Sequence, residues 1–400
     1  MKCYCVINFQ QALQMVDRPT PTPTGTQVLL QVRAAGVCHS DLHIWEGGYD
    51  LGHGKRLSLK DRGINLPLAM GHETVGTVVS MGPDATGVEK GKNYVVFPWI
   101  GCRQCVACLE GMENHCSAPQ YLGVYRDGGY ADHIVVPDAR YLVDIGDLDP
   151  ATTAPYACSG LTTYSALNKV GAKTFQNHPV VIMGAGGLGL MCLELVKAQG
   201  GAGAIVVDID PVKRQAALDA GAMAAIDGNA PDAAQQIIKA NGGKMVQAVI
   251  DLVGAPSTTQ IGFDSIIKGG KLIIVGLFGG ASPWPIAFIP MRAMHIIGSY
   301  VGSLQEFHEL MALVRAGKVK PIQVTRHDLS EADAVLASLH HGKVTGRAVL
   351  TAWYFCKARN TWRVASGLPA RCSVSCSRKR ALSSGSFCRS LKSGSSASRP

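Results

Sequence analysis

Four cysteines fall within sixteen positions of this 400-residue chain, in the stretch GCRQCVACLEGMENHC that begins at Gly101. Their spacings of three, three and eight residues let four thiolates converge from a folded-back loop on one tetrahedral ion. Four sulfurs leave no vacant coordination position, so the pattern predicts a structural zinc and not a catalytic one. The predicted ligands are Cys102, Cys105, Cys108 and Cys116.

Other uses of these thiols stay open on the spacing alone. Disulfides are typical of small secreted domains, whereas this chain is long enough for two full cores and 47% of its residues are hydrophobic. The first residues show no signal-peptide pattern, so we expect the thiols to lie in a reducing cytoplasm. An iron–sulfur centre also uses four thiolates, and unligated thiols are the remaining alternative.

A second set of metal-binding residue types is scattered through the first half of the chain. The segments are GVCHSDLH, MGHETVG and YACSGLTTY, which supply Cys38, His72 and Cys158. Taken alone, a buried Cys is usually a small hydrophobic residue, and a lone His usually packs in a core or lies at the surface. A catalytic zinc needs about three protein ligands and an open position. The three segments together are candidates for such a site.

A glycine-rich turn, GAGGLG, follows the apolar segment Val180–Met183 and opens a predicted helix. Its amides and the positive helix end can face a pyrophosphate. Asp208 ends the next predicted strand, 19 residues beyond Gly189, where a carboxylate accepts hydrogen bonds from an adenosine ribose and repels a 2′-phosphate. This favours NAD over NADP. The alternative is that the glycines serve only turns and packing. The predicted cofactor-binding residues here are Gly184, Gly186, Gly187, Leu188, Gly189, Asp208 and Lys213.

The pattern of predicted secondary structure changes at about Ala157. The first 150 or so residues contain β-branched runs broken by Gly, Pro and Asp, which is typical of short strands. Strands and helices then alternate, which is typical of a parallel sheet. A helix over 304–316 and a final strand are expected to follow. The predicted fold class is α/β, with a β-rich region and a doubly wound dinucleotide-binding region.

The positive charge is concentrated at the end of the chain. Residues 353–400 contain ten Lys or Arg and no Asp or Glu, which leaves residues 1–352 at −1 out of the net +9. We therefore expect no nucleic-acid binding by residues 1–352. The Ser-rich tail shows no helical or strand period and is predicted to be disordered; a basic binding arm is the alternative. The longest apolar stretch, 180–196, is broken by glycines and Glu194, so no membrane span is expected.

The motifs, taken in order, resemble those of the zinc-dependent alcohol dehydrogenases of the medium-chain dehydrogenase/reductase family. CHSDLHIW, GHE, CSGLTTY and the four-cysteine segment match in family order, and the resemblance covers residues 1–352. It implies a GroES-like catalytic domain over 1–158, to which 301–352 return, and a Rossmann NAD-binding domain over 159–300. It also implies two zinc ions, one catalytic and one structural, and a homodimer or homotetramer.

Carried over position by position, the resemblance assigns a role to each motif residue. Catalytic zinc would be held by Cys38, His72 and Cys158. Asp41 would orient His72, and Glu73 would be the carboxylate that approaches the metal. Ser40 would bond the substrate hydroxyl and His43 would be the distal proton acceptor. The remaining cofactor contacts would be His39, Thr162 and Arg347; the suggested pocket walls, with plain packing as the alternative, are Trp45, Tyr49, Phe97 and Trp99.

The implied reaction is reversible hydride transfer between an alcohol and NAD, giving an aldehyde or ketone. Two alternatives remain: a metal-free NADPH quinone or enoyl reductase of the same fold, and a non-catalytic zinc-stabilised binding protein. The polar segment Asp50–Pro67 is longer than a simple ethanol-type enzyme would need. We hypothesise that this segment admits a larger or acidic alcohol.

Overall fold

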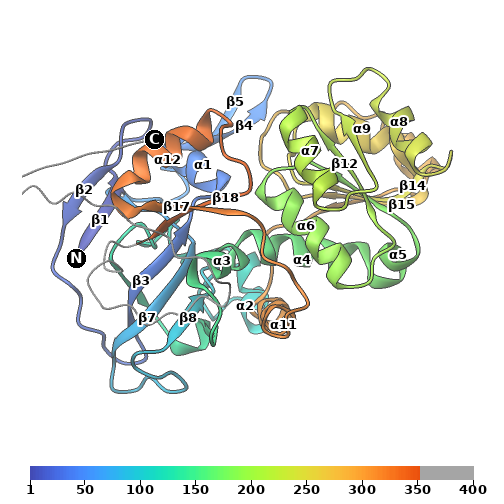
Figure 1. Cartoon of the computed structure of the whole chain (residues 1–400). Coiled ribbons are helices and arrows are strands. Elements are labelled where there is room, and N and C mark those ends of the chain that lie inside the picture. Colours follow the sequence, from blue (N-terminus) through green and yellow to red (C-terminus); the bar gives the residue numbers. More distant parts are fainter. Residues whose placement is uncertain (352–400) are drawn as a thin grey trace, which may run out of the picture. The chain divides into compact units, whose positions relative to one another are not determined.

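The computed structural model describes residues 1–351. The basic segment 353–400, predicted to be disordered, lies outside the described residues. Among residues 1–351, no helix combines the length and the apolar character needed to cross a membrane. Figure 1 shows a β-rich part built from both ends of the described chain and a second part in which helices flank a parallel sheet.

The β-rich part is organised by one seven-stranded sheet. Its strand order is β10-β8-β7-β3-β18-β17, and β9 also pairs with β3. The strands of this part are β1 (Lys2–Val6), β2 (Gln14–Asp17), β3 (Val28–Gly36), β4 (Gly48–Gly52), β5 (Lys55–Ser58), β6 (Leu68–Ala69), β7 (Glu73–Met81), β8 (Asn93–Val96), β9 (His133–Val136), β10 (Leu142–Asp144), β17 (Val324–Asp328) and β18 (Arg347–Thr351). Because β18 pairs antiparallel with β3, the last described strand completes a sheet begun some 310 residues earlier.

Short helices connect these strands and carry most of the motif residues. They are α1 (His39–Glu46), α2 (Val106–Leu109), η1 (Glu113–His115), η2 (Ala139–Tyr141), α3 (Pro150–Thr153), η3 (Ala154–Ala157), α11 (Leu304–Arg315), η4 (Leu329–Glu331) and α12 (Ala332–His340), where η marks a 3-10 helix. Helix α11 begins where the sequence predicts and ends one residue earlier. A capping box between Ser303 and Glu306 fixes its start, because the Ser303 hydroxyl accepts from the Glu306 amide.

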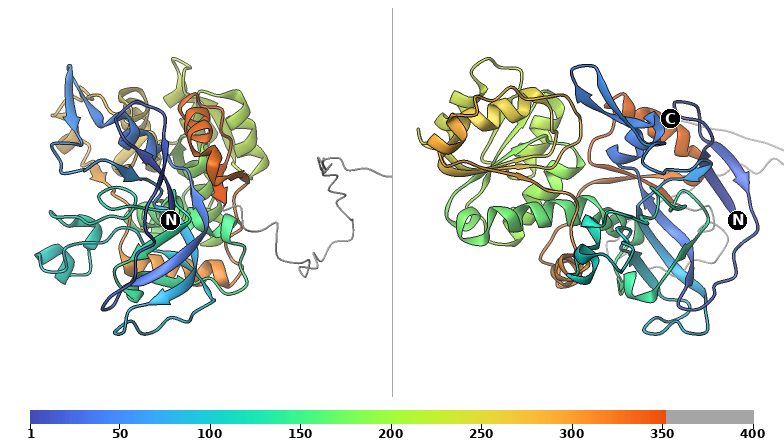
Figure 2. Two further views of the ribbon diagram at one scale, coloured as in Figure 1. Left: turned by 90° about the vertical axis from the view of Figure 1, so that its left-hand side faces the viewer. Right: turned by 180° about the vertical axis from the view of Figure 1, so that it is seen from behind.

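The second part is a parallel sheet of strand order β13-β12-β11-β14-β15-β16. This is the doubly wound order of dinucleotide-binding folds, and it confirms the predicted fold class. The elements are α4 (Ser159–Val170), α5 (Ala172–Asn177), β11 (Val180–Met183), α6 (Gly187–Ala198), β12 (Ala204–Asp208), α7 (Pro211–Asp219), β13 (Ala224–Asp227), α8 (Ala233–Ala240), β14 (Val246–Asp251), α9 (Pro256–Ser265), β15 (Ile266–Ile274), α10 (Phe288–Met291) and β16 (His295–Gly298). The views in Figure 2 show helices on both faces of this sheet.

The apolar runs in the sequence explain why this sheet is central. All four residues of β11 are buried, as expected for a strand covered on both faces. The chain leaves β11 through the glycine turn and enters α6, and Asp208 is the last residue of the neighbouring strand β12. The carboxyl ends of β11 and β12 therefore place the turn and this carboxylate side by side, where ligands bind in open α/β sheets.

Candidate active site

The predicted catalytic ligands come from three junctions between secondary-structure elements. Cys38 is the N-cap residue of α1, His72 directly precedes β7, and Cys158 is the N-cap residue of α4. All three side chains are buried, and one ligand atom of each lies within 4.8 Å of the others. The structure thus brings together residues that lie up to 120 positions apart.

The donor set fits a tetrahedral zinc ion with one position free. The Sγ atoms of Cys38 and Cys158 are 3.9 Å apart. Two thiolates at about 2.3 Å from a tetrahedral zinc would be separated by about 3.8 Å. Among the described residues, His72 Nε2 is buried and has no hydrogen-bond partner, as a nitrogen reserved for a metal would be. Two sulfurs and one nitrogen leave the fourth position for a substrate oxygen.

A carboxylate behind the cluster fixes the orientation of these ligands. Asp41 Oδ1 lies 3.2 Å from His72 Nδ1, while its Oδ2 accepts from the Cys38 amide and from the Tyr130 hydroxyl. A carboxylate on the second ring nitrogen is the usual partner of a metal-binding histidine. The sequence did not single out Tyr130, since nothing in the segment DGGYADH points to a metal site.

Glu73 occupies the other side of the cluster, beside Arg347. Its Oε1 accepts from the Arg347 guanidinium at 2.8 Å and from the Ser159 amide at 3.2 Å. Burial raises the pKa of Glu73 to about 8, although the positive charge of Arg347 acts in the opposite direction. A Cβ at Gly36 would lie 2.0 Å from Glu73 Oε2, so only glycine leaves room for this carboxyl group.

The two catalytic-site thiols lie within hydrogen-bond distance of each other. This contact lowers the pKa of Cys38 well below its ordinary value and raises the pKa of Cys158, to which burial also contributes. Metal ligands must be deprotonated, so metal binding would release any proton that these thiols hold.

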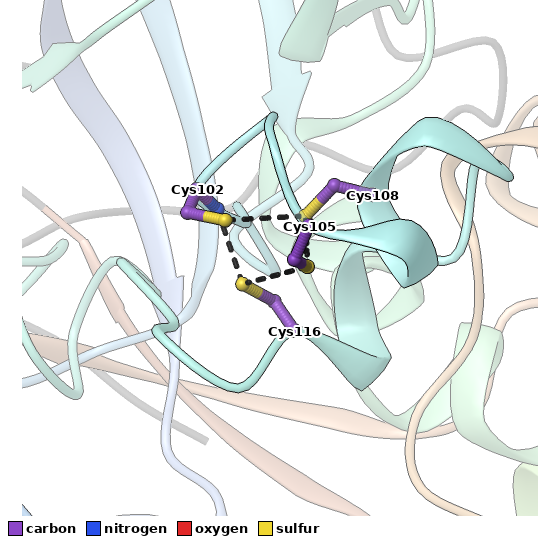
Figure 3. A group of neighbouring side chains, drawn as sticks. All are labelled: Cys102, Cys105, Cys108 and Cys116. Carbon is purple, nitrogen blue, oxygen red and sulfur yellow. Dashed lines mark hydrogen bonds between the residues drawn. The ribbon is translucent and has the colours of Figure 1, made fainter.

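The four cysteines of the predicted structural site lie on one loop and turn toward one another (Figure 3). Their Sγ atoms are separated by 4.0 Å for Cys102–Cys108, 3.5 Å for Cys105–Cys108 and 3.8 Å for Cys105–Cys116. These separations match a single tetrahedral ion. An iron–sulfur cluster would insert several atoms between the thiolates and hold them farther apart. Gly101 is required sterically, because a Cβ there would lie 2.4 Å from Cys108 Sγ.

A cavity of about 350 Å³ joins the catalytic cluster to the glycine turn. Gly184 has a φ of +94°, and a Cβ on Gly189 would lie 1.9 Å from the Gly184 carbonyl oxygen. No side chain caps the first turn of α6, and a Cβ on Gly186 would meet no atom within 4 Å. The open space beside these free amides fits a pyrophosphate.

The structure places all the other predicted cofactor residues in the lining of this cavity. These are His39, Thr162, Leu188, Asp208, Lys213 and Arg347. Asp208 Oδ2 accepts from the Ala185 amide at 2.7 Å, which ties the carboxylate to the glycine turn. Each carboxylate oxygen can accept a second hydrogen bond, so a ribose hydroxyl still finds an acceptor.

Ser40 and His43 line the same cavity from α1. The Ser40 Oγ atom lies 4.0 Å from Cys38 Sγ, and His43 Nδ1 lies 3.4 Å from a carboxylate oxygen of Glu46. The His43 ring is 4.8 Å from the ring of Tyr49. Ser40 therefore lies beside the catalytic cluster, and His43 lies beside Tyr49 in the cavity lining.

The suggested pocket walls divide into two pairs. Tyr49 and Trp99 line the cavity, as do Val124 and Tyr300, which the sequence analysis missed. Trp45 and Phe97 do not: the indole of Trp45 donates to the Gln11 carbonyl, and Phe97 stacks on Tyr141 in the core. The sequence does not show which of these aromatic side chains face the cavity and which pack in the core.

The segment Asp50–Pro67 begins inside β4 and includes β5, and it lies next to the turn around Gly280, whose amide donates to the Asp50 carbonyl. Its basic side chains are not part of the cavity lining among residues 1–351. Arg56 instead donates to the Glu46 carbonyl. The hypothesis that this segment admits a larger or acidic alcohol stays a prediction, and the basic side chains of the segment itself add no charge to the cavity wall.

Comparison with known proteins agrees with this geometry. The model of the alcohol dehydrogenase GroES-like domain matches residues 24–147, and that of the zinc-binding dehydrogenase domain matches residues 187–316. An NAD-dependent alcohol dehydrogenase of Sulfurisphaera tokodaii is 37% identical over 351 residues, 88% of this chain and 99% of that protein. One from Saccharolobus solfataricus is 35% identical over the same shares.

Solved structures show the same relationship. The alcohol dehydrogenase of Aeropyrum pernix has a TM-score of 0.79 at 30% identity, and the match covers 88% of this chain and 100% of that one. Acetophenone reductase of Geotrichum candidum, solved in complex with NAD, has a TM-score of 0.74 at 28% identity, with 88% and 96% covered. The resemblance inferred from the motifs is confirmed, and the chain belongs to the zinc-dependent alcohol dehydrogenases of the medium-chain dehydrogenase/reductase family.

Proposed function

We propose that this protein is an NAD-dependent alcohol dehydrogenase that interconverts an alcohol and an aldehyde or ketone. The observation that carries the proposal is one cavity lined both by the buried thiols Cys38 and Cys158 and by the glycine turn with Asp208. The names of the relatives from S. tokodaii and S. solfataricus support the same reaction.

The bound groups supply the reactive centres. A zinc ion held by Cys38, His72 and Cys158 supplies Lewis acidity that makes a coordinated hydroxyl more acidic, and a nicotinamide supplies the hydride acceptor. The chain's residues orient the substrate and move the proton. Ser40, beside the cluster, would accept the hydroxyl proton and pass it, by way of a ribose hydroxyl, toward His43. An imidazole is suited to the outer end of this relay because its ordinary pKa of about 6.5 lies near neutrality.

The remaining residues hold the reactants in place. Asp41 would keep His72 in one tautomer, and Glu73 would be the carboxylate that can approach the metal. His39 and Arg347 would face the pyrophosphate beside the glycine turn, and Thr162 would contact the nicotinamide. Asp208 and Lys213 would hold the adenosine ribose. The cavity lining supports the roles of the cofactor residues, and the contacts of Asp41 with His72 and of Glu73 with Arg347 support the other two.

Zinc content and cofactor choice test the proposal together. Zinc would be measured by mass spectrometry, and NAD and NADP reduction would be followed with primary, secondary, aromatic and acidic alcohols. Two zincs per chain with NAD-linked turnover are expected. One zinc with NADPH-linked reduction of a quinone or enone would favour the metal-free reductase. Bound zinc with neither activity would favour a binding protein.

We further propose that residues 1–158 and 301–352 form the catalytic domain and residues 159–300 the NAD-binding domain. The pairing of β18 with β3 supports the return of the last segment to the first domain. Under mildly denaturing conditions, hydrogen exchange of residues 159–300 is expected to change as one unit, separately from that of residues 1–158 and 301–351. Exchange that changes together across residue 158 or 300 would contradict these boundaries.

A homodimer or homotetramer is proposed from the outer strand of the parallel sheet. β16 is an edge strand of that sheet, and the nearby apolar residues Ile286 and Met291 are 81% and 65% exposed. An unpaired edge beside exposed apolar side chains favours pairing with a second chain. Light scattering would give the mass, and a monomer would contradict the proposal.

The free state of the nine described cysteines supports a cytoplasmic location.

A further inference from the structure

Asn114 connects the four-cysteine loop to the wall of the cavity. It lies in η1, two residues before Cys116, and is 3% exposed. Its Nδ2 atom donates to the backbone carbonyl of Tyr300 at 3.0 Å, across 186 positions of sequence. Tyr300 lies in the connection between β16 and α11, and it lines the cavity. In Figures 1 and 2 the cysteine loop and α11 lie side by side.

Three aromatic rings fill the space between the loop and the cluster. Trp99 makes edge contacts with Tyr121 and Tyr300, at centroid distances of 5.4 and 6.2 Å. Trp99 also lies 5.3 Å from the ring of His72. The Tyr121 hydroxyl donates to the Asn114 carbonyl at 2.8 Å, so Asn114 is held by its backbone while its amide holds Tyr300.

The segment held by Asn114 is strained. Val301 has a φ of +42°, although left-handed backbone is unfavourable for a β-branched residue. Such a conformation is unfavourable and persists only where the surroundings impose it. Tyr300 is 42% exposed, so contacts with Trp99 and Tyr121 hold its ring on one side only. The hydrogen bond from Asn114 to the Tyr300 carbonyl, just before Val301, is a tether that can hold the backbone of this segment in place.

We propose that Asn114 is a positioning residue that fixes the ring of Tyr300 at the substrate end of the cavity. The four-cysteine loop then has a second role beyond its own stability, because it sets the shape of the substrate pocket. This inference rests on the proposed alcohol dehydrogenase function. Loss of the tether would loosen one aromatic wall and leave the zinc ligands and the glycine turn in place.

The test compares Asn114→Asp and Asn114→Ala with Asn241→Asp. Asp keeps the shape of Asn, and its ionised form cannot donate to a carbonyl, while Ala removes the donor at any pH. Asn241 is a matched control, because its Nδ2 also donates to a backbone carbonyl, that of Lys244, near the end of α8 and outside the cavity. For the Asn114 variants we expect the KM for 1-phenylethanol to rise about three- to tenfold, the range that corresponds to one lost aromatic contact. The KM for ethanol and both kcat values should change less than about twofold, since ethanol is too short to need that wall.

A second readout does not depend on turnover. Hydrogen exchange of residues 299–302, measured by mass spectrometry, should be faster in both Asn114 variants and unchanged in Asn241→Asp. Exchange in β11 should be the same in all proteins. In a Tyr300→Ala background, Asn114→Ala should no longer change the ratio of the two KM values, because the ring that it positions is gone.

The outcomes separate this inference from the proposed function. An unchanged KM ratio and unchanged exchange in variants that retain two zincs would overturn the role of Asn114. Equal rises for both alcohols, or loss of zinc from both Asn114 variants, would also overturn it by making the residue purely structural. A wild-type protein without NAD-linked turnover would instead refute the proposed function, and the exchange measurement would still decide whether the tether exists.

Discussion

The guanidinium of Arg347 lies 2.8 Å from Glu73 Oε1, although the two residues are 274 positions apart and both are buried. Above a pH of about 8, where the Glu73 carboxyl group is ionised, Arg347→Met would leave this group buried without its counter-charge. Removing one partner of a buried pair costs about 3–5 kcal/mol. We therefore expect a marked fall in the midpoint of thermal unfolding, measured by calorimetry at matched zinc content.

The surface pair between Arg326 and Asp149 is the control for that change. Its N to O distance is also 2.8 Å, but both side chains are exposed. Arg326→Met should alter stability by less than about 1 kcal/mol. Equal effects of the two substitutions would show that the burial of the Arg347 pair does not matter.

The two metal sites should respond differently to the loss of one thiol. Cys38→Ser is expected to abolish turnover and to remove one zinc per chain, because the substrate oxygen would lose its metal. Cys105→Ser should remove the other zinc and chiefly lower the unfolding temperature while kcat is retained, since no residue of that loop lines the cavity and its effect on the pocket passes only through the bond from Asn114 to Tyr300. Metal content, turnover and calorimetry would be measured on both variants. Equal losses of kcat in equally folded proteins would contradict the two roles.

Cofactor preference should depend on Asp208. Asp208→Gly removes the carboxylate that would accept from the ribose and repel a 2′-phosphate. We expect the ratio of kcat/KM for NADP to that for NAD to rise by at least about tenfold, a change of about 1.4 kcal/mol. Asp227→Gly is the control, because Asp227 ends the neighbouring strand β13 outside the cavity lining. A ratio that does not move in either variant would refute the role of Asp208.

Tyr130 should strengthen zinc binding through Asp41. Its hydroxyl donates to Asp41 Oδ2 at 3.0 Å, and partners of this kind are worth about 10–100-fold in metal affinity. Tyr130→Phe is therefore expected to weaken catalytic zinc binding about tenfold in a competition titration with a chelator. The buried Tyr156 hydroxyl has no hydrogen-bond partner among the described residues, so Tyr156→Phe should leave the affinity unchanged. Similar losses in both variants would point to packing as the cause.

Much of the site could be predicted from the sequence, because the chemistry of the site depends on residue types at short spacing. The four cysteines, the turn after β11 and the residues from Cys38 to His43 each lie within one short segment. The fold class followed from the alternation of apolar runs and helices, whereas the strand order was seen only in the structure. The matching of Cys38 with His72 and Cys158 required the family resemblance, because their meeting depends on how β3, β7 and α4 pack.

What the sequence missed lies in contacts between distant segments. Tyr130, Asn114 and Tyr300 act through one hydroxyl, one side-chain amide and one backbone carbonyl, and no local pattern marks such atoms. Trp45 and Phe97 were suggested as pocket walls, with packing as the alternative, because they lie near the motifs in the sequence. Aromatic residues near a motif fill cores as readily as cavities, and only the packed structure tells the two apart.

Helix α1 carries Cys38 at its N-cap and then His39, Ser40, Asp41 and His43 within two turns. Each added or removed residue turns everything before it by about 100° relative to everything after it. A one-residue insertion after Ser40 would therefore rotate the Cys38 thiol and the Ser40 hydroxyl away from the carboxylate and the imidazole that follow them on the helix. Natural or engineered length variation should be confined to places such as the tip between β4 and β5, while this helix should tolerate changes only at the side chains without a role in the site, and never a change of length.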